Sequence, residues 1–344
     1  MDKLVVRERR MNQEKIWLDN GSDKLEIKAV RSKLTDVLEQ AAALPMWSQD
    51  YTQLDKGGFS GTVTSVASQG VQIFSEAMNR SVDELASAPP DSYVIGLPTI
   101  VEGDALWCGS KLTKNSLISL DKNDELLFKT SHSSEITAAV ISEQRLEEYA
   151  ERVEKVDLRP LISKVNPVEK LPPDIQSRLL AILYIGTEHL AKNIEDGVSH
   201  PNSWRHFEDS VFSSCMQALT AASNNNDRHH ENRVHRYIVK SVREMTLTQH
   251  CDPITIGEIC TTLNISRRTL NHAFQQVLGI TPVAYMRNIR LHKIRAELQY
   301  KSKQLNSIAC VASHWGFWHM SLFARYYREL FGETPSETLA RSHH

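Results

Sequence analysis

The sequence has few cysteines, and their spacing excludes the structures that cysteines usually build. The five cysteines among 344 residues are scattered and odd in number, and no two of them form a CxxC pair. This pattern fits a reducing compartment. It argues against a disulfide framework and against a cysteine zinc site.

Long apolar runs and catalytic motifs are missing as well. No apolar stretch approaches the ~18 residues of a membrane-spanning helix, and the first ten residues lack the apolar core of a secretory signal. There is no P-loop, no nucleophile elbow and no HExxH motif. We therefore expect a cytoplasmic protein with no membrane contact, no cofactor and no enzymatic activity.

The net charge of −2 conceals an asymmetry along the chain. Residues 228–344 hold 16 Lys and Arg against 8 Asp and Glu, whereas residues 1–227 hold 24 against 34. An acidic front part followed by a basic tail is typical of a regulatory module joined to a nucleic-acid-binding module.

Short strands separated by turn residues dominate residues 57–141. Such a series predicts an antiparallel sandwich or barrel, cupin-like in type, and thus an α+β fold for the whole chain. A metal enzyme of that type needs several histidines and a carboxylate at one ion, whereas this segment contains only His132. We therefore expect no metal. Ahead of the strands, residues 35–44 predict a helix capped by Thr35 or Asp36.

Helical spacing replaces the strand pattern over residues 142–222. Ser142 opens a capping pattern, and apolar residues recur at helical spacing over 175–190 and 207–219. These two amphipathic helices could form a dimerisation hairpin or cover the barrel, and the sequence leaves both possibilities open. We expect residues 1–222 to form an effector-sensing and dimerisation domain. A polar stretch predicts a linker at 223–230, with Asn224, Asn225 and Asn226 as its hinge.

Several apolar and aromatic residues of the strand region are candidates for lining a small-molecule site. They are Phe59, Ile73, Phe74, Tyr93, Trp107 and Phe128. The simpler interpretation is that they form the core of the barrel itself, and we assign none of them to a site.

A helix-turn-helix pattern begins at Thr255. Thr255 caps a first helix in a capping box with Glu258, and Ser266 caps a second helix, whose first N–H groups face outward toward a phosphate. Leu270 and Phe274 anchor this second helix inward. Its outward side chains are of the types that read base edges, namely Arg267, Arg268, Asn271, His272 and Gln275.

The pattern occurs a second time from Ser307. Each unit is a short helix, a tight turn, a second helix and a Gly-x-Thr-Pro sequence, which ends at Pro282 in the first unit and at Pro335 in the second. Core positions of the second unit are expected at Trp315, Phe317, Phe323 and Tyr327. Its exposed side is expected to hold Trp318, His319, Met320, Ser321, Ala324 and Arg325.

A basic helix joins the two units. It is expected to run from Pro282 to about Leu298, roughly 27 Å at ~1.5 Å per residue, close to the ~34 Å between successive major-groove faces. Its basic residues are Arg287, Arg290, Lys293 and Arg295, of which we expect Arg287 and Arg290 to meet phosphates. One such motif is commonly a plain helical hairpin, but two copies joined by a basic helix favour duplex DNA as the ligand.

Residues 231–340 resemble the DNA-binding domain of the AraC/XylS family of bacterial transcription regulators. The matching residues are Ser266, Leu270, Phe274, Gly279, Thr281-Pro282, Ile308-Ala309, Gly316-Phe317, Phe323, Phe331-Gly332 and Thr334-Pro335. The resemblance implies that Arg268, Asn271 and His272 read bases in the first half-site, and that Met320, Ser321, Ala324 and Arg325 read the second. Met320 and Ala324 cannot donate hydrogen bonds, so the second half-site should be read through apolar contacts or more weakly.

Two further resemblances bear on the front part and on enzymatic alternatives. Segments such as Met46-Trp-Ser-Gln-Asp-Tyr and Gly316-Phe-Trp-His look loosely like the ethanolamine-operon activator subgroup, whose members sense a small molecule. Alkyl-transfer DNA-repair proteins also share the helix-turn-helix pattern, but they need clustered zinc-binding cysteines, which this chain lacks.

The sequence as a whole predicts a DNA-binding transcription regulator of the bacterial cytoplasm and nucleoid. We expect an activator that responds to a small metabolite, binds two successive major grooves, forms a homodimer and contacts RNA polymerase. The alternatives are a ligand-independent repressor or architectural protein, and a barrel enzyme tethered to DNA.

Overall fold

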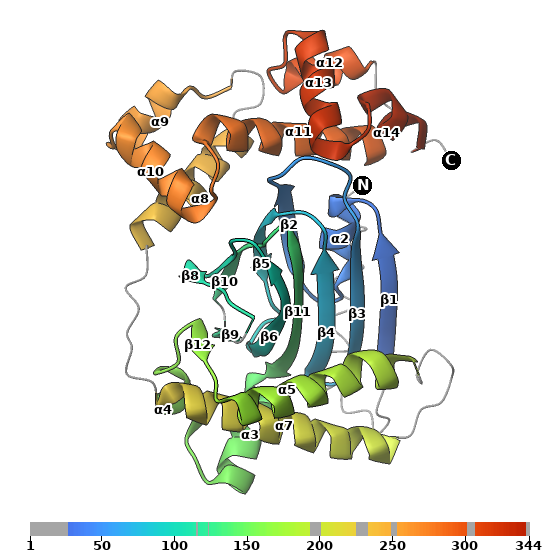
Figure 1. Cartoon of the computed structure of the whole chain (residues 1–344), viewed down its shortest axis with the longest axis vertical. Helices are drawn as coiled ribbons and strands as arrows, with labels where there is room; N and C mark the ends of the chain where they lie inside the picture. The colour runs from blue at the N-terminus through green and yellow to red at the C-terminus, as the bar shows by residue number, and fades with distance from the viewer. Residues whose placement is uncertain are drawn as a thin grey trace.

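Two antiparallel sheets form the front part of the chain (Figure 1). The structure is a computed structural model, and it describes residues 27–114, 116–122, 124–192, 201–224, 233–248, 253–300 and 307–341. One sheet has the order β1 (Lys28–Leu34), β3 (Gly61–Ser68), β4 (Val71–Met78), β11 (Ser133–Ser142), β6 (Ser92–Glu102), β9 (Ser116–Leu120) and β12 (Val168–Lys170). The other has the order β2 (Ser48–Gln53), β5 (Val82–Ser87), β10 (Glu125–Lys129), β7 (Leu106–Trp107) and β8 (Ser110–Lys111).

The two sheets face each other as a sandwich, which confirms the predicted α+β class, although the sheets do not close into one barrel. Side chains alternate between the two faces of each strand. On β11, Ala138 and Val140 point into the sandwich, whereas Ala139 and Ile141 point out of it. Trp107 and Phe128 pack edge to face inside the sandwich, with ring centroids 5.1 Å apart.

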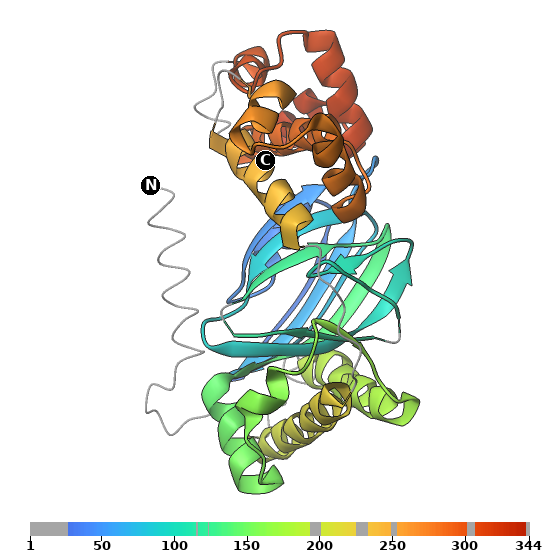
Figure 2. The same ribbon diagram turned by 90° about the vertical axis from the view of Figure 1, so that its left-hand side faces the viewer.

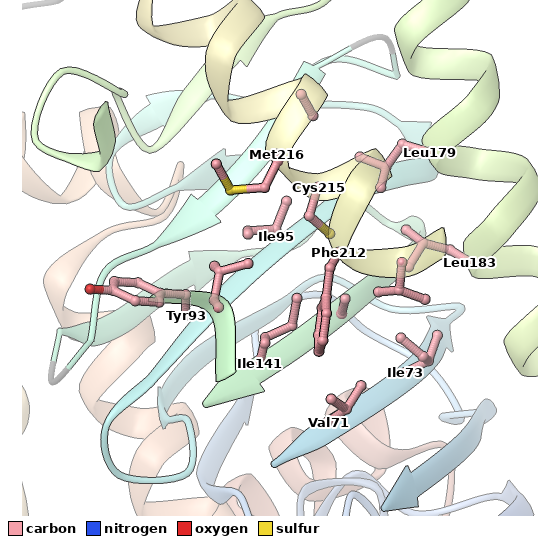
Figure 3. Close-up of a cluster of buried hydrophobic side chains, with 14 of the residues drawn as sticks. Val71, Ile73, Tyr93, Ile95, Ile141, Leu179, Leu183, Phe212, Cys215 and Met216 are labelled. Atoms are coloured by element: carbon pink, nitrogen blue, oxygen red, sulfur yellow. The ribbon is translucent and has the colours of Figure 1, made fainter. Parts of the chain in front are cut away.

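Helices cover the outer face of the larger sheet. They are α3 (Glu143–Tyr149), α4 (Leu158–Ile162), α5 (Pro173–Tyr184) and α7 (Pro201–Ser223), together with π-helical turns at Ala150–Glu154 and Ile185–Leu190. Figure 3 shows Leu179 and Leu183 of α5 and Phe212 and Cys215 of α7 over the strand residue Ile73. The apolar stripes of both helices are thus used in covering the sheet, and their role in dimerisation stays a prediction.

Some sequence-based expectations for the front part were wrong. Strands begin at Lys28, well before residue 57, because β1 and β2 alternate polar and apolar residues too weakly to be recognised. Of the candidate ligand-lining residues, Ile73 and Tyr93 lie under the helices rather than inside the sandwich.

The helix predicted at 35–44 is α2 (Val37–Ala43), and its cap is Asp36, whose side chain accepts from the backbone N of Leu38 at 2.8 Å.

The C-terminal part is helical. It consists of α8 (Arg233–Thr248), α9 (Ile256–Thr262), α10 (Arg267–Val277), α11 (Pro282–Tyr300), α12 (Ile308–His314), α13 (Met320–Phe331) and α14 (Pro335–Arg341). These helices lie at one end of the sandwich and α3, α5 and α7 lie at the opposite end (Figures 1 and 2). Most of the linker predicted at 223–230, including the hinge residues Asn225 and Asn226, lies outside the described residues.

Two separate apolar cores hold the C-terminal helices together. One surrounds Leu270, Phe274 and Ile289, and the other surrounds Leu291, Phe323 and Tyr327, so that α11 contributes to both. Val234 and Tyr237 of α8 take no part in these cores, and their side chains are 69% and 66% exposed. Within the described ranges, no helix is both long and apolar enough to cross a bilayer.

Candidate nucleic-acid interface

The first helix-turn-helix unit is built as its caps predict. Thr255 and Glu258 form the reciprocal capping box at the start of α9, and the Ser266 hydroxyl accepts from the backbone N of Thr269 at 3.0 Å at the start of α10. Leu270 and Phe274 are buried, whereas the predicted base-reading side chains are all exposed. These exposed residues are Arg267, Arg268, Asn271, His272 and Gln275.

The second unit repeats the arrangement, with Gly316 at the left-handed turn position that Asn264 occupies in the first. Gly316 has φ +76°, a left-handed conformation that favours glycine, and a Cβ atom there would lie 2.1 Å from the Cγ of Pro253. This close approach explains why the turn needs glycine before the buried Phe317. The contact also fixes the second unit against the segment that precedes α9.

The reading side of α13 is less polar than that of α10. Ser321 and Arg325 are exposed, whereas Met320 and Ala324 are half-buried. Just before the helix, Trp318 is 68% exposed, although a tryptophan usually buries its large apolar surface. The start of α13 therefore offers apolar and aromatic surface to a ligand, together with a single arginine.

The basic residues of α11 are more engaged than the sequence suggests. The Arg287 guanidinium lies over the Tyr326 ring, 4.2 Å from its centroid. Arg290 is half-buried, donates its Nε to the Met286 carbonyl at 3.2 Å and lies over the Phe317 ring. Both arginines thus brace α11 against neighbouring residues, and their contact with phosphates stays a prediction.

Arg295, the last basic residue predicted on the helix that joins the two units, is buried at the contact with the front domain. Its Nη2 lies 2.6 Å from the Asp36 carboxylate of the sandwich, and the two side chains are only 4% and 5% exposed. Burial alone would raise the pKa of Asp36, but Arg295 and the surrounding hydrogen bonds outweigh it, and the pKa lies below its ordinary value. The expectation that Arg295 adds to a free basic face was therefore wrong.

A second buried arginine joins α8 to the sandwich. Arg243 lies 2.9 Å from the Asp50 carboxylate on β2 and 3.2 Å from that of Asp83 on β5. The Tyr285 hydroxyl of α11 donates to Asp83 and lies 3.1 Å from the same guanidinium. These contacts connect α8 and α11 of the C-terminal part to the neighbouring strands β2 and β5.

The polar contacts continue along α11. The backbone N of Gln53 donates to Nε2 of His292 at 2.8 Å, and the Asn288 amide donates to the Gln53 carbonyl at 3.1 Å. Burial, with Arg295 nearby, lowers the pKa of His292 to about 3, so the ring is neutral and can accept this bond.

The front domain also holds the C-terminal end of α13 and lies close to that of α10, the second helices of the two units. The backbone N of Gly57 and the side-chain amide of Gln53 donate to the Leu330 carbonyl at 3.2 and 2.7 Å, which satisfies a carbonyl that the end of α13 leaves open. At the end of α10, Gly279 approaches Lys129 of β10. The N-terminal halves, where the predicted base-reading residues lie, remain exposed.

This interdomain contact was not predicted from the sequence. A signal existed, because Asn288, His292 and Arg295 follow helical spacing and interrupt the apolar face of α11. A polar stripe between two apolar cores indicates a buried polar interface. Its partners, Asp36, Gln53 and Asp83, come from distant parts of the chain and have no common pattern.

Comparisons with known proteins agree with the helix-turn-helix geometry. Residues 259–341 match the family model described as "Helix-turn-helix domain". The chain is 40% identical over 86 residues to the XylDLEGF operon transcriptional activator of Pseudomonas putida. These aligned residues make up 25% of this chain and 27% of that protein. The first three curated relatives match this chain over only 21%, 26% and 27% of their own lengths.

Two solved structures are also similar to the chain. A probable AraC family transcriptional regulator from Rhodopseudomonas palustris is 34% identical, with 31% of this chain and 97% of that chain covered and a TM-score of 0.29. ToxT from Vibrio cholerae is 12% identical, with 93% and 100% covered and a TM-score of 0.30.

In the two helix-turn-helix units, the residues that resemble the AraC/XylS family form caps, turns and core positions. The Gly316-Phe317 turn, the Ser266 cap and the two Gly-x-Thr-Pro sequences all lie within the matched residues 259–341. The C-terminal part of this chain is therefore a helix-turn-helix domain of the AraC/XylS type.

Proposed function

We propose that this regulator reads two successive major grooves of one DNA duplex and controls transcription in response to a small metabolite bound by its front domain. The supporting observation is the placement of two exposed helix starts near the two ends of α11 (Figure 1). Nineteen residues of α11 span roughly 28 Å at ~1.5 Å per residue, comparable with one turn of the duplex.

The two half-sites should differ in how strictly they are read. Arg268 and Asn271 of α10 carry donors suited to guanine and adenine edges, whereas α13 offers Met320 and Ala324 beside a single arginine, with Trp318 just before the helix. We propose activation as the direction of control, with a homodimer and RNA polymerase as the further partners. The acidic front domain supports a regulatory role, since it gains nothing from contact with phosphates.

Selection from random duplexes with the full chain tests the proposal. We expect an enriched site with two half-sites about 10 bp apart and an affinity that falls steeply with salt, because phosphate neutralisation releases counterions. Arg268→Ala should then cost ~1–3 kcal/mol on that site and relax preference at one or two base pairs.

Arg159→Ala is the matched control, because Arg159 is an exposed arginine of the front domain, far along the chain from the units. It should leave both affinity and preference unchanged. Equal losses on the selected site and on random DNA for Arg268→Ala would contradict base reading by α10.

A further inference from the structure

The interior of the sandwich contains two buried carboxylates whose hydrogen-bond donors are all uncharged side chains. Glu76 on β4 and Glu84 on β5 are 2% and 1% exposed. Their partners are the Tyr51 hydroxyl, which donates to Glu76 at 2.9 Å, and the amides of Gln40 and Gln49, which donate to Glu76 at 2.9 Å and to Glu84 at 3.3 Å. An ionised carboxylate is costly to bury unless a cation or several donors compensate it.

The unsatisfied atoms of this cluster are all acceptors. Among the described residues, Oε2 of Glu84 and the Oε1 atoms of Gln40 and Gln49 have no hydrogen-bond partner. The Gln49 amide also donates to the Tyr51 hydroxyl at 2.7 Å, so the five side chains form one connected chain. When both carboxyl groups are deprotonated, this network lacks a positive charge and a group with several N–H or O–H donors.

We propose that this cluster, which we call the carboxylate cluster (Gln40, Gln49, Tyr51, Glu76 and Glu84), binds the primary ammonium group of a small organic effector. An ammonium group carries one charge and three donors, matching the three unsatisfied acceptors. This inference rests on the proposed function, because it names the chemical class of the metabolite that the front domain would sense.

The surroundings fit an organic cation better than a metal ion. Phe74 lies two residues before Glu76 on the same face of β4, and Trp47 packs against it with ring centroids 5.6 Å apart. Aromatic rings beside carboxylates are a common environment for ammonium groups. In the part of the chain that the structure describes, no group of three or more His, Cys, Asp or Glu side chains is arranged for a metal ion.

The same two strands connect the cluster to the DNA-binding helices. On β2, Tyr51 belongs to the cluster, and Gln53, two residues further along the same face, donates to the Leu330 carbonyl at the end of α13. On β5, Asp83 directly precedes Glu84 and contacts Arg243 on the opposite face. A ligand that shifts β2 or β5 would therefore act on the Gln53–Leu330 and Asp83–Arg243 contacts between the domains. An effector changes a conformational equilibrium only if it binds one of the two arrangements more tightly, and these contacts provide such a difference.

Burial of the two carboxyl groups predicts how binding should depend on pH. It raises the pKa of Glu76 to about 7 and that of Glu84 well above its ordinary value, with the nearby Glu76 adding to the second effect. Near neutral pH the cluster therefore retains protons that a bound ammonium group would displace. Binding should release protons and should tighten as the pH rises toward 8.

Thermal unfolding of the full chain with n-butylammonium chloride tests the proposal. At ten times the dissociation constant we expect the midpoint to rise by about 3–6 °C. Tetramethylammonium chloride should have less effect, because it has the charge without donors, and sodium chloride, sodium butyrate and n-butanol should have none. Calorimetry in two buffers of different ionisation enthalpy should show proton release.

Glu84→Gln keeps the shape of the side chain and removes one charge, so the butylammonium shift should disappear. If this variant does not fold, Tyr51→Phe, which removes only the bridging hydroxyl, should reduce the shift instead. Glu148→Gln, at an exposed glutamate of α3, is the matched control and should keep the full shift.

Several outcomes would overturn the proposal. They are no shift with butylammonium in the wild type, an equal shift with sodium or with butyrate, and a shift that survives Glu84→Gln. DNA binding of the same wild-type sample is measured in parallel. If DNA binding is normal and the ammonium shift is absent, only this inference fails, whereas absence of DNA binding refutes the proposed function itself.

Discussion

The Asp36–Arg295 pair offers a direct test of how the two domains are held together. Asp36 has two roles, because it caps α2 through the backbone N of Leu38 and receives Arg295 of α11 at 2.6 Å. An asparagine in its place would keep the cap, since Asn and Asp are about equally good at the N-cap of a helix. Asp36→Asn therefore removes the charge from the interface and leaves the helix start intact.

The expected loss of unfolding free energy depends on the burial of the pair and on the partners that Arg295 keeps in the variant. Removing one partner of a buried ion pair costs about 3–5 kcal/mol when the other charge is left alone. Arg295 is not left alone, because the Glu333 carboxylate lies 2.7 Å from its Nη1. We therefore expect a loss near that of a hydrogen bond to a charged group, about 1.5–3 kcal/mol.

Glu188→Gln is the matched control. It breaks the Arg31–Glu188 pair of the front domain, which is longer, at 3.3 Å, and whose side chains are 37% and 44% exposed. Exposed pairs contribute about 0–1 kcal/mol because water screens both charges. The two variants thus remove the same kind of group and differ in its burial.

Thermal unfolding and hydrogen exchange of the full chain provide the assay. Asp36→Asn should lower the unfolding midpoint by several degrees, at about 2–4 °C per kcal/mol. It should also speed exchange of the Gln53 amide, which donates to His292 at the same interface. Equal midpoints for Asp36→Asn and Glu188→Gln, with unchanged exchange at Gln53, would refute the view that this buried pair fixes the domain orientation.

Three further predictions concern pH, the reading surface and the front domain. The pKa of Glu76 in the folded protein, about 7, exceeds its ordinary value of 4.5, so the free energy of unfolding should fall as the pH rises from 4.5 to 7, by at most ~1.4 kcal/mol per pH unit. Glu76→Gln should flatten this dependence, as measured by unfolding midpoints over the same pH range. Trp318 is 68% exposed whereas the other described tryptophans are at least partly buried, so DNA should shift or quench its emission, and Trp318→Phe should abolish most of the change; an unchanged spectrum on binding would place Trp318 outside the interface. Removing residues 1–220 should leave salt-sensitive DNA binding but abolish dimerisation and effector dependence, and light scattering that still shows a dimer would contradict this division of roles.

The helix-turn-helix units could be predicted in detail because their signals are local. Thr255 with Glu258, Ser266 and Gly316 each determine a cap or a turn within a few residues, and the structure confirms all of these. The apolar spacing around Phe274 and Phe323 identifies the buried sides. What faces outward then follows by elimination, and the predicted reading residues are exposed except Met320 and Ala324, which are half-buried.

The interdomain contact could not be predicted because its partners are far apart in the sequence. Asp36 and Arg295 are separated by 259 residues, and Arg243 meets Asp83 across 160. Each of these charges, taken alone, is indistinguishable from a solvated surface residue. The carboxylate cluster was missed for the same reason, since Glu76 and Glu84 stand in strands whose inward direction only the paired sheets establish.

The position of the contacts decides how a signal from the front domain can reach DNA. The sandwich holds the end of α13 through Gln53 and the middle of α11 through His292 and Arg295, while the starts of both recognition helices stay free. A change at β2 would therefore alter the angle or spacing of the two reading helices rather than cover them. Such a change favours or disfavours DNA whose half-sites are one turn apart, so an effector should change affinity for the paired site more than affinity for a single half-site. Equal effects on the two kinds of duplex would instead indicate that the front domain acts by pairing two chains.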